Sequence, residues 1–136
     1  MDTSNLEKSQ KMIARLIECA AENGIKESMI QFSDLGLDSS YEEYFYPCLE
    51  WLEREGIVRT KAHHRTMGGA ASGSIQNLVL TSVGQSLLGM KVSVGDKEET
   101  LAETVEKVSK GDQSYSKFGD FLGGAIGGPI KSLGAG

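Results

Sequence analysis

The chain has 136 residues, a net charge of −5 and a sequence pI near 5.0, with many of its 17 glycines in the last third. This length fits one domain with a tail, and the acidic balance gives no general attraction to nucleic acid or to an anionic bilayer. No stretch approaches the ~20 apolar residues of a membrane span, and the N-terminus lacks an apolar signal-peptide core, so we expect a cytoplasmic protein.

Two helices are predicted in the first 37 residues. The first covers residues 4–23 and ends at Gly24, which takes a left-handed C-cap conformation cheaply. Its apolar side chains recur at i, i+3, i+4 and i+7, namely Ile13, Leu16, Ile17 and Ala20. A short second helix is predicted over residues 25–37, broken by Gly36.

The third predicted helix carries the strongest signals. Ser39 and Ser40 each stand three residues before a glutamate, a capping-box spacing, and Gly56 ends the helix. One face is apolar and holds Phe45, Cys48, Leu49 and Leu52. Pro47 either kinks this helix about one turn in or starts a shorter helix as its first residue.

A β-hairpin and a fourth helix are predicted next. The strands are IVRTK and NLVLT, and the Gly-rich segment AHHRTMGGAASGSIQ between them predicts a long, mobile tip. Thr81 is expected to cap the short helix SVGQSLLG, whose Val83, Leu87 and Leu88 return to the core.

This order of elements predicts a mostly α-helical α+β fold, the winged helix-turn-helix. A three-helix core and a β-hairpin wing would occupy residues 1–90, since each apolar stripe then finds a partner. Residues 91–136 would form a helical or flexible Gly-rich tail, starting with a linker or a short strand over 91–96. An amphipathic helix is predicted over residues 98–110.

The segment 117–136 places glycines four apart at 119, 123 and 127, among apolar side chains that include Phe118, Phe121 and Leu122. Small residues at this spacing let helices approach closely. A flexible tail, a self-association or partner-docking segment, and a weak contact with a membrane surface all remain open.

Residues 46–59 have the sequence YPCLEWLEREGIVR, which resembles the recognition helix and first wing strand of PadR-type transcriptional regulators. The matching positions are Tyr46, Pro47, Leu49, Leu52, Glu53, Gly56, Ile57 and Val58. Residues 80–88, LTSVGQSLL, are similar to the Leu-Thr, Gly and Leu-Leu signature that follows the wing in that family. The resemblance implies a winged-helix fold and binding to DNA.

Charge argues both for and against DNA binding. Residues 1–90 hold eight Lys and Arg against twelve Asp and Glu, and the third helix is acidic, which repels phosphate. The counterweight is a basic cluster on the wing, made of Arg59, Lys61, His63, His64 and Arg65. Lys8, Lys11 and Arg15 of the first helix could add phosphate contacts, although the wing cluster could also be an ordinary solvated hairpin.

Other functional sites have weaker support. Cys19 and Cys48 are expected to be buried thiols, with a disulfide as the alternative. Adjacent histidines on a strand point to opposite faces, so His63 and His64 chelate a metal poorly. We find no nucleophile with a base and no phosphate-binding glycine loop followed by Lys and Ser/Thr, and we expect neither a cofactor nor an enzyme.

Two hypotheses follow. In the first, the chain is a dimeric winged-helix regulator whose third helix and wing contact DNA. Its candidate DNA-binding residues are Tyr41, Tyr44, Arg54, Arg59, Lys61, His63, His64 and Arg65. In the second, the acidic third helix binds a protein, with Trp51, Phe118, Phe121 and Leu122 as contacts. Trp51 either is exposed for this purpose or packs under the wing or the tail.

Overall fold

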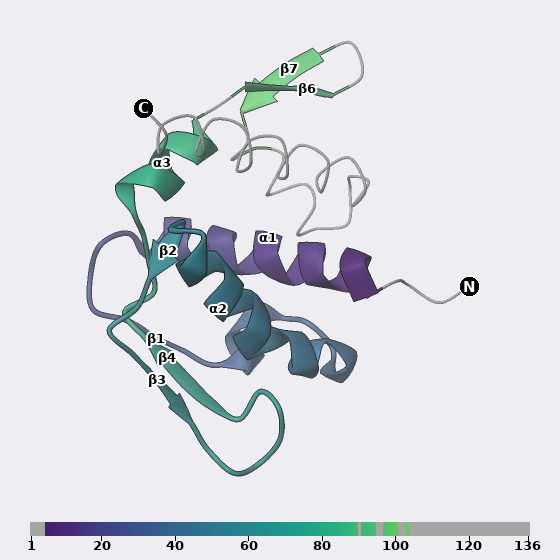
Figure 1. Ribbon diagram of the computed structural model, residues 1–136, viewed down its shortest axis with the longest axis vertical. Coiled ribbons are helices and arrows are strands. Elements are labelled where there is room, and N and C mark those ends of the chain that lie inside the picture. Colours follow the sequence, from purple (N-terminus) through teal and green to yellow (C-terminus); the bar gives the residue numbers. More distant parts are fainter. Residues whose placement is uncertain (1–4, 90, 95–96, 101–102, 104–136) are drawn as a thin grey trace.

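The computed structural model describes residues 5–89, 91–94, 97–100 and 103, and shows an α+β fold. Helix α2 (Phe45–Arg54) packs across helix α1 (Asn5–Asn23), and small antiparallel sheets lie beside them (Figure 1). The fold class predicted from the sequence is confirmed at this level.

Helix α1 forms where its apolar stripe predicts it. Met12, Ile13, Leu16, Ile17 and Ala20 are buried, and they share one face because of their spacing. The helix ends at Asn23, and the Gly24 amide donates to the Ala20 carbonyl at 3.1 Å. Residue 4, the predicted start, lies outside the described residues.

The predicted helix over residues 25–37 is wrong. The segment instead contains strand β1 (Met29–Ile30) and the 3₁₀ helix η1 (Phe32–Leu35), which ends at Gly36. Ile30 is buried and pairs with Ile75 in strand β4 (Gly73–Gln76), whereas Ile25 and Met29 are 75% and 62% exposed. Phe32 and Leu35 of η1 also pack in or against the core, so the buried apolar residues are shared between a strand and a 3₁₀ helix. Pairing with a distant strand therefore outweighs the local helical pattern.

The third predicted helix has two parts. A 3₁₀ helix, η2 (Ser39–Tyr44), comes first, and its cap is Asp38, whose carboxylate accepts from the Ser40 amide at 2.9 Å. The predicted capping boxes at Ser39 and Ser40 are thus replaced by a cap one residue earlier. Pro47 is the third residue of α2, where no earlier carbonyl of the helix requires its missing N–H.

The end of α2 confirms the stop predicted at Gly56. The Ile57 amide donates to the Leu52 carbonyl and the Gly56 amide to the Glu53 carbonyl, both at 3.0 Å. These two bonds form a Schellman motif, which requires a left-handed residue at Gly56, where φ is +80°.

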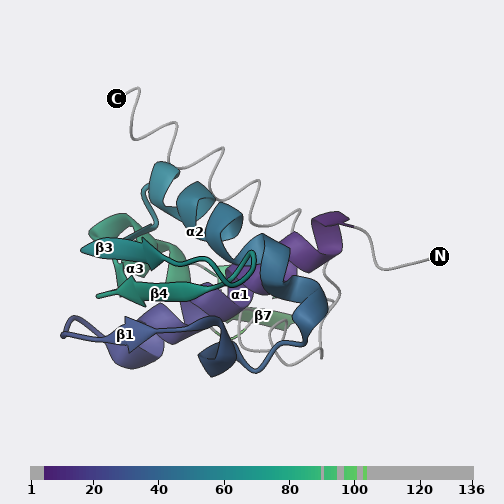
Figure 2. The same ribbon diagram turned by 90° about the horizontal axis from the view of Figure 1, so that it is seen from below.

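The predicted wing, which comprises residues 58–80, is more ordered than the sequence predicts. Strands β2 (Val58–Arg59) and β5 (Val79–Leu80) pair at its base. Beyond them, β3 (Ala62–Arg65) pairs with β4 (Gly73–Gln76), and the sheet has the order β1-β4-β3 (Figure 2). The prediction of a mobile loop over residues 62–76 is therefore wrong where β3 and β4 form. Only residues 66–72 remain as the tip of the hairpin.

Helix α3 (Ser82–Leu88) follows as predicted, with the Thr81 hydroxyl accepting from the Gly84 amide at 3.0 Å. Gly84 permits a close approach to Ile57, the residue before β2, because a Cβ there would lie 2.2 Å from the Ile57 carbonyl oxygen. Leu87 is buried, and Val83 and Leu88 pack against the core. The predicted return of this helix to the core is confirmed.

Strands β6 (Lys91–Val94) and β7 (Lys97–Thr100) form a separate two-stranded ribbon. The short strand was one of the two expectations for residues 91–96, but the helix predicted from residue 98 is wrong over 98–100. Thr100 and Glu103 make reciprocal hydrogen bonds of 3.0–3.2 Å, the capping box of a helix start. The rest of that predicted helix and the Gly-rich segment lie outside the described residues.

Candidate functional site

A shallow groove lies at the base of the wing. Its volume is about 280 Å³, and it is lined by Ile25, Lys26, Arg59, Thr60, Lys61, Asn77 and Val79. Three of these seven residues are cationic and none is acidic. Arg59 and Lys61 were predicted from the sequence as DNA contacts, and both are exposed. Within the described part of the chain, neither makes an ion pair.

Lys26 is the basic residue that the sequence argument missed. It lies in the loop between α1 and β1, more than thirty residues before Arg59. Asn77 holds this loop against the wing: its side-chain Oδ1 accepts from the Ser28 amide, and its own amide donates to the Ser28 carbonyl, both at 2.9 Å. The signal that could have found Lys26 is a long-range pairing of this loop with Asn77, which local sequence patterns do not reveal.

Asn77 can make both bonds because its backbone is left-handed, with φ of +57°. Asparagine adopts this conformation more readily than most residues that carry a Cβ. Since its Oδ1 faces the Ser28 donor, its Nδ2 amino group points elsewhere and has no hydrogen bond among the described residues. Asn77 is one of the residues that line the groove.

The other predicted wing residues lie along β3. His63 faces α2, and its Nε2 is 2.8 Å from Glu53 Oε1, whereas His64 Nε2 is 3.4 Å from Gln76 Oε1. The two histidines therefore diverge, as the strand geometry predicts. The Arg65 guanidinium lies 4.6 Å from the centroid of the Tyr46 ring in α2. This cation–π contact ties Arg65 to α2, although the residue stays exposed.

The exposed stripe of η2 and α2 is acidic. It comprises Glu43, Pro47, Glu50 and Arg54. Tyr41, predicted to be exposed, is only 9% exposed, which makes it part of the core; that prediction is wrong. Tyr44 is half-buried, and its hydroxyl donates to Asn5 Oδ1 at 2.6 Å. Of the three helix residues proposed to reach bases, Arg54 alone is exposed.

Trp51 is half-buried and packs against the hydrophobic core. It therefore offers less apolar surface to a partner than a fully exposed tryptophan would. The other predicted partner contacts, Phe118, Phe121 and Leu122, lie outside the described residues.

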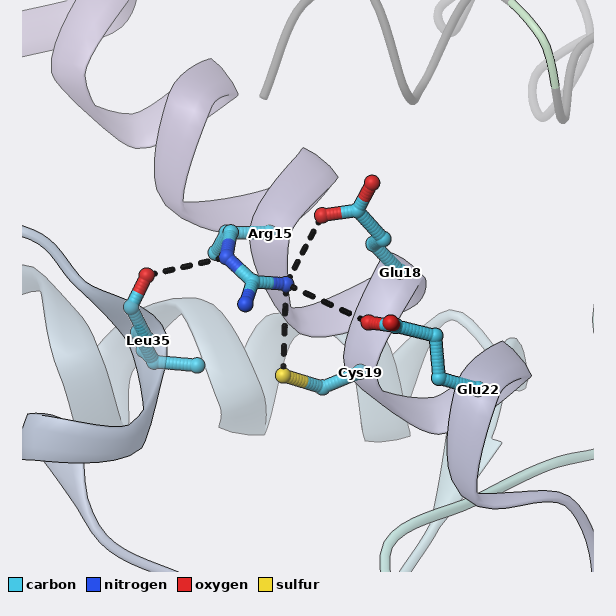
Figure 3. A network of polar contacts seen from close by, with 5 residues as sticks. All are labelled: Arg15, Glu18, Cys19, Glu22 and Leu35. Carbon is cyan, nitrogen blue, oxygen red and sulfur yellow. Dashed lines mark hydrogen bonds and ion pairs between the residues drawn. The ribbon is translucent and has the colours of Figure 1, made fainter. Parts of the chain in front are cut away.

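The cations of α1 are occupied within the fold. Arg15 Nε donates to the Leu35 carbonyl at 2.9 Å, and its Nη1 lies 2.8 Å from Glu18 and 3.7 Å from Glu22 (Figure 3). Lys8 and Lys11 each place their Nζ 5.6 Å from the Tyr41 ring centroid. Arg15 therefore holds η1 against α1, and its side chain is already committed.

Both cysteines are buried free thiols, as expected, and the alternative of a disulfide is wrong. Burial raises the pKa of Cys19, although the nearby Arg15 partly opposes the shift. Burial also raises the pKa of Cys48 to about 11, against a lowering by its hydrogen bond to Ser9. Such thiols are poor nucleophiles at neutral pH.

Across the described ranges, no three His, Cys, Asp or Glu side chains gather as metal ligands would, and no helix has the length and apolarity to cross a membrane. No protein-family model, curated protein or solved structure matches this chain.

Proposed function

We propose that this chain is a winged-helix protein that binds double-stranded DNA through the cationic residues at the start of its wing. Helix α2 contributes little direct readout of the nucleobases. The observation that carries the proposal is the exposure of Arg59 and Lys61 on one short segment, with no carboxylate paired to either among the described residues. Most of the affinity of proteins for DNA comes from neutralising phosphates with such side chains.

The arrangement of the strands supports a winged helix. Strand β1 follows α1 and pairs with β4, the returning strand of the hairpin, so the wing is fixed to the helical core. Helix α2 leads into β2 and β3, as a recognition helix leads into a wing. The segment of η1 takes the place of the second core helix as a single 3₁₀ turn.

Contact through phosphates explains why α2 carries so few groups that read bases. Glu43 of η2 and Glu50 of α2 lie on the exposed stripe and repel the backbone of a duplex, and Arg54 is the stripe's one cation. Phosphate contacts fix the position of a protein on DNA but carry no sequence information themselves. We therefore expect binding with weak sequence preference and a steep dependence on salt.

The test is fluorescence anisotropy of a labelled random-sequence duplex from 25 to 200 mM KCl, on the order of the salt range over which such binding weakens. Replacing Arg59 and Lys61 together by Gln should weaken binding. It should also lower the slope of log K against log salt by about 0.9 for each lost phosphate contact. The matched control replaces Lys8 and Lys11 by Gln, which removes the same charge from α1 and should leave the slope unchanged.

A second function, binding of a protein with a basic surface, is favoured by the acidic stripe that holds Glu43 of η2 and Glu50 of α2. The same titration separates the two. Absence of duplex binding at 25 mM KCl, on the order of the lowest salt at which such contacts are measured, would remove the DNA proposal and leave this one. Equal losses in the wing and α1 variants would also contradict a wing-led contact.

A further inference from the structure

The groove at the base of the wing gathers positive charge from two distant parts of the chain. Lys26 comes from the loop after α1. Arg59 comes from β2, and Lys61 from the link between β2 and β3. Three like charges around one groove repel one another unless an anion or solvent lies between them. No carboxylate is among the residues that line this groove, although Glu53 Oε2 accepts from the hydroxyl of its lining residue Thr60 at 2.9 Å.

The groove is also held in shape before any ligand binds. Two hydrogen bonds of 2.9 Å join Asn77 to Ser28, and a third of the same length runs from the Lys61 amide to the Gln76 carbonyl. These bonds fix the backbone that carries Lys26 relative to the backbone that carries Lys61. Binding then orders side chains alone, which lowers its entropic cost.

The donors in this groove suit a phosphate. A guanidinium can donate two parallel hydrogen bonds to phosphate oxygens, and an ammonium binds phosphate as a point charge. The spare Nδ2 of Asn77 adds a neutral donor, and Ile25 and Val79 supply an apolar wall. At about 280 Å³ the groove is at the lower limit of pockets that enclose drug-sized ligands, which fits a small group.

We propose that this groove binds a phosphate group, with Lys26, Arg59 and Lys61 as its cations and Asn77 as a neutral donor. The phosphate is either a phosphodiester of the duplex or the phosphate of a small molecule, and the chemistry is the same for both. If the phosphate belongs to a duplex, the inference rests on the proposed DNA binding. If it belongs to a small molecule, the inference is independent of that proposal. Lys26 and Asn77 are the residues it adds to the wing.

The experiment records ¹H–¹⁵N correlation spectra of the full chain during titration with sodium pyrophosphate and, separately, with a short duplex, at constant ionic strength. The key variant is Asn77→Asp. Aspartate tolerates the left-handed backbone and still accepts from the Ser28 amide, but it loses the donor and places a negative charge at the groove. Lys11→Gln is the matched control, because it lowers the net charge by the same amount on α1.

We expect saturable shifts of the Asn77 side-chain amide and of the Thr60 and Lys61 amides. The dissociation constant should rise by about tenfold or more in Asn77→Asp, as for loss of a charge-assisted contact, and stay unchanged in Lys11→Gln. Lys26→Gln, at an exposed loop position, provides a second variant if Asn77→Asp does not fold.

The two titrations distinguish the sources. Pyrophosphate shifts of the groove signals support a site for small phosphates, even if duplex binding fails. Shifts with the duplex alone support a phosphodiester contact. If the duplex shifts the Thr60 and Lys61 amides while the Asn77 side-chain amide stays still and both variants bind as the wild type does, the groove proposal is overturned, whereas DNA binding through Arg59 and Lys61 stands. Still signals in both titrations also overturn it.

Discussion

Cys48 shows how one buried side chain makes the stability of this fold depend on pH. It lies in α2 against α1, where its Sγ is 3.7 Å from the Ser9 carbonyl oxygen. The side chain is 5% exposed, and burial raises its pKa from 9.0 to about 11 because the thiolate would lose its hydration. The folded chain therefore holds the neutral thiol over a range in which the unfolded chain ionises.

The sign of the effect follows from this difference. Below pH 9 both states hold the proton, so the contribution of Cys48 to stability is complete; it falls as pH rises toward 11. The loss is on the order of 2–3 kcal/mol from a shift of two units. We expect urea unfolding at pH 7 to 11 to show the wild type losing about this much more stability than Cys48→Ala. Parallel curves for the two proteins would contradict the assignment.

Single residues also show where prediction of the site from sequence ends. Arg59 and Lys61 were predicted because they are neighbours in the chain. Lys26 was missed because the link that brings it to them is the pair of hydrogen bonds between Asn77 and Ser28. Tyr41 was placed on the wrong side because the 3₁₀ turns of η2 rotate its side chain inward, relative to an α-helix with the same cap.

Between elements, Glu53 connects α2 to the wing. Its Oε1 lies 2.8 Å from His63 Nε2, and its Oε2 accepts from the Thr60 hydroxyl at 2.9 Å. One carboxylate therefore contacts both Thr60, which precedes β3, and His63, which lies within β3. It orients the wing against α2 as well as adding stability.

Glu53→Ala should loosen the wing more than it destabilises the core. The loss of two hydrogen bonds suggests a cost on the order of 1–3 kcal/mol, part of it as local opening. Hydrogen exchange should become faster at the amides of β3 and β4 while those of α1 change less. Glu50→Ala, one turn earlier on the exposed stripe of α2, is the control and should leave exchange unchanged. Equal acceleration in α1 and β3 would mean that Glu53 stabilises the whole fold instead.

At this scale the sequence predicted elements that depend on local signals. Helices α1 and α3 and the end of α2 follow from apolar spacing, the Thr81 cap and Gly56. The strands β1, β3 and β4 depend on pairing between distant residues such as Ile30 and Ile75. Glycine and serine in β4 also hide its strand character, since both residues are typical of turns.

Over the whole molecule, all buried core residues among those described fall between Met12 and Leu87 in the sequence. The ribbon of β6 and β7 pairs only with itself, and Figure 1 shows it at the opposite end of the molecule from the hairpin of β3 and β4. The wing groove and the core that supports it thus belong to residues 5–89. The domain boundary near residue 90, which the change in composition predicts, stays a prediction.

A chain shortened to residues 1–90 should therefore fold and keep its site. It retains every described core residue, so its free energy of unfolding should match that of the full chain to within about 1 kcal/mol. Its affinity for the random duplex should change little, because Lys26, Arg59, Lys61 and Asn77 all remain. Sedimentation of both chains measures the tail separately: a full chain that dimerises beside a monomeric shortened chain would assign self-association to residues 91–136. A shortened chain that is much less stable, or that no longer binds where the full chain does, would mean that the tail completes the core or the site.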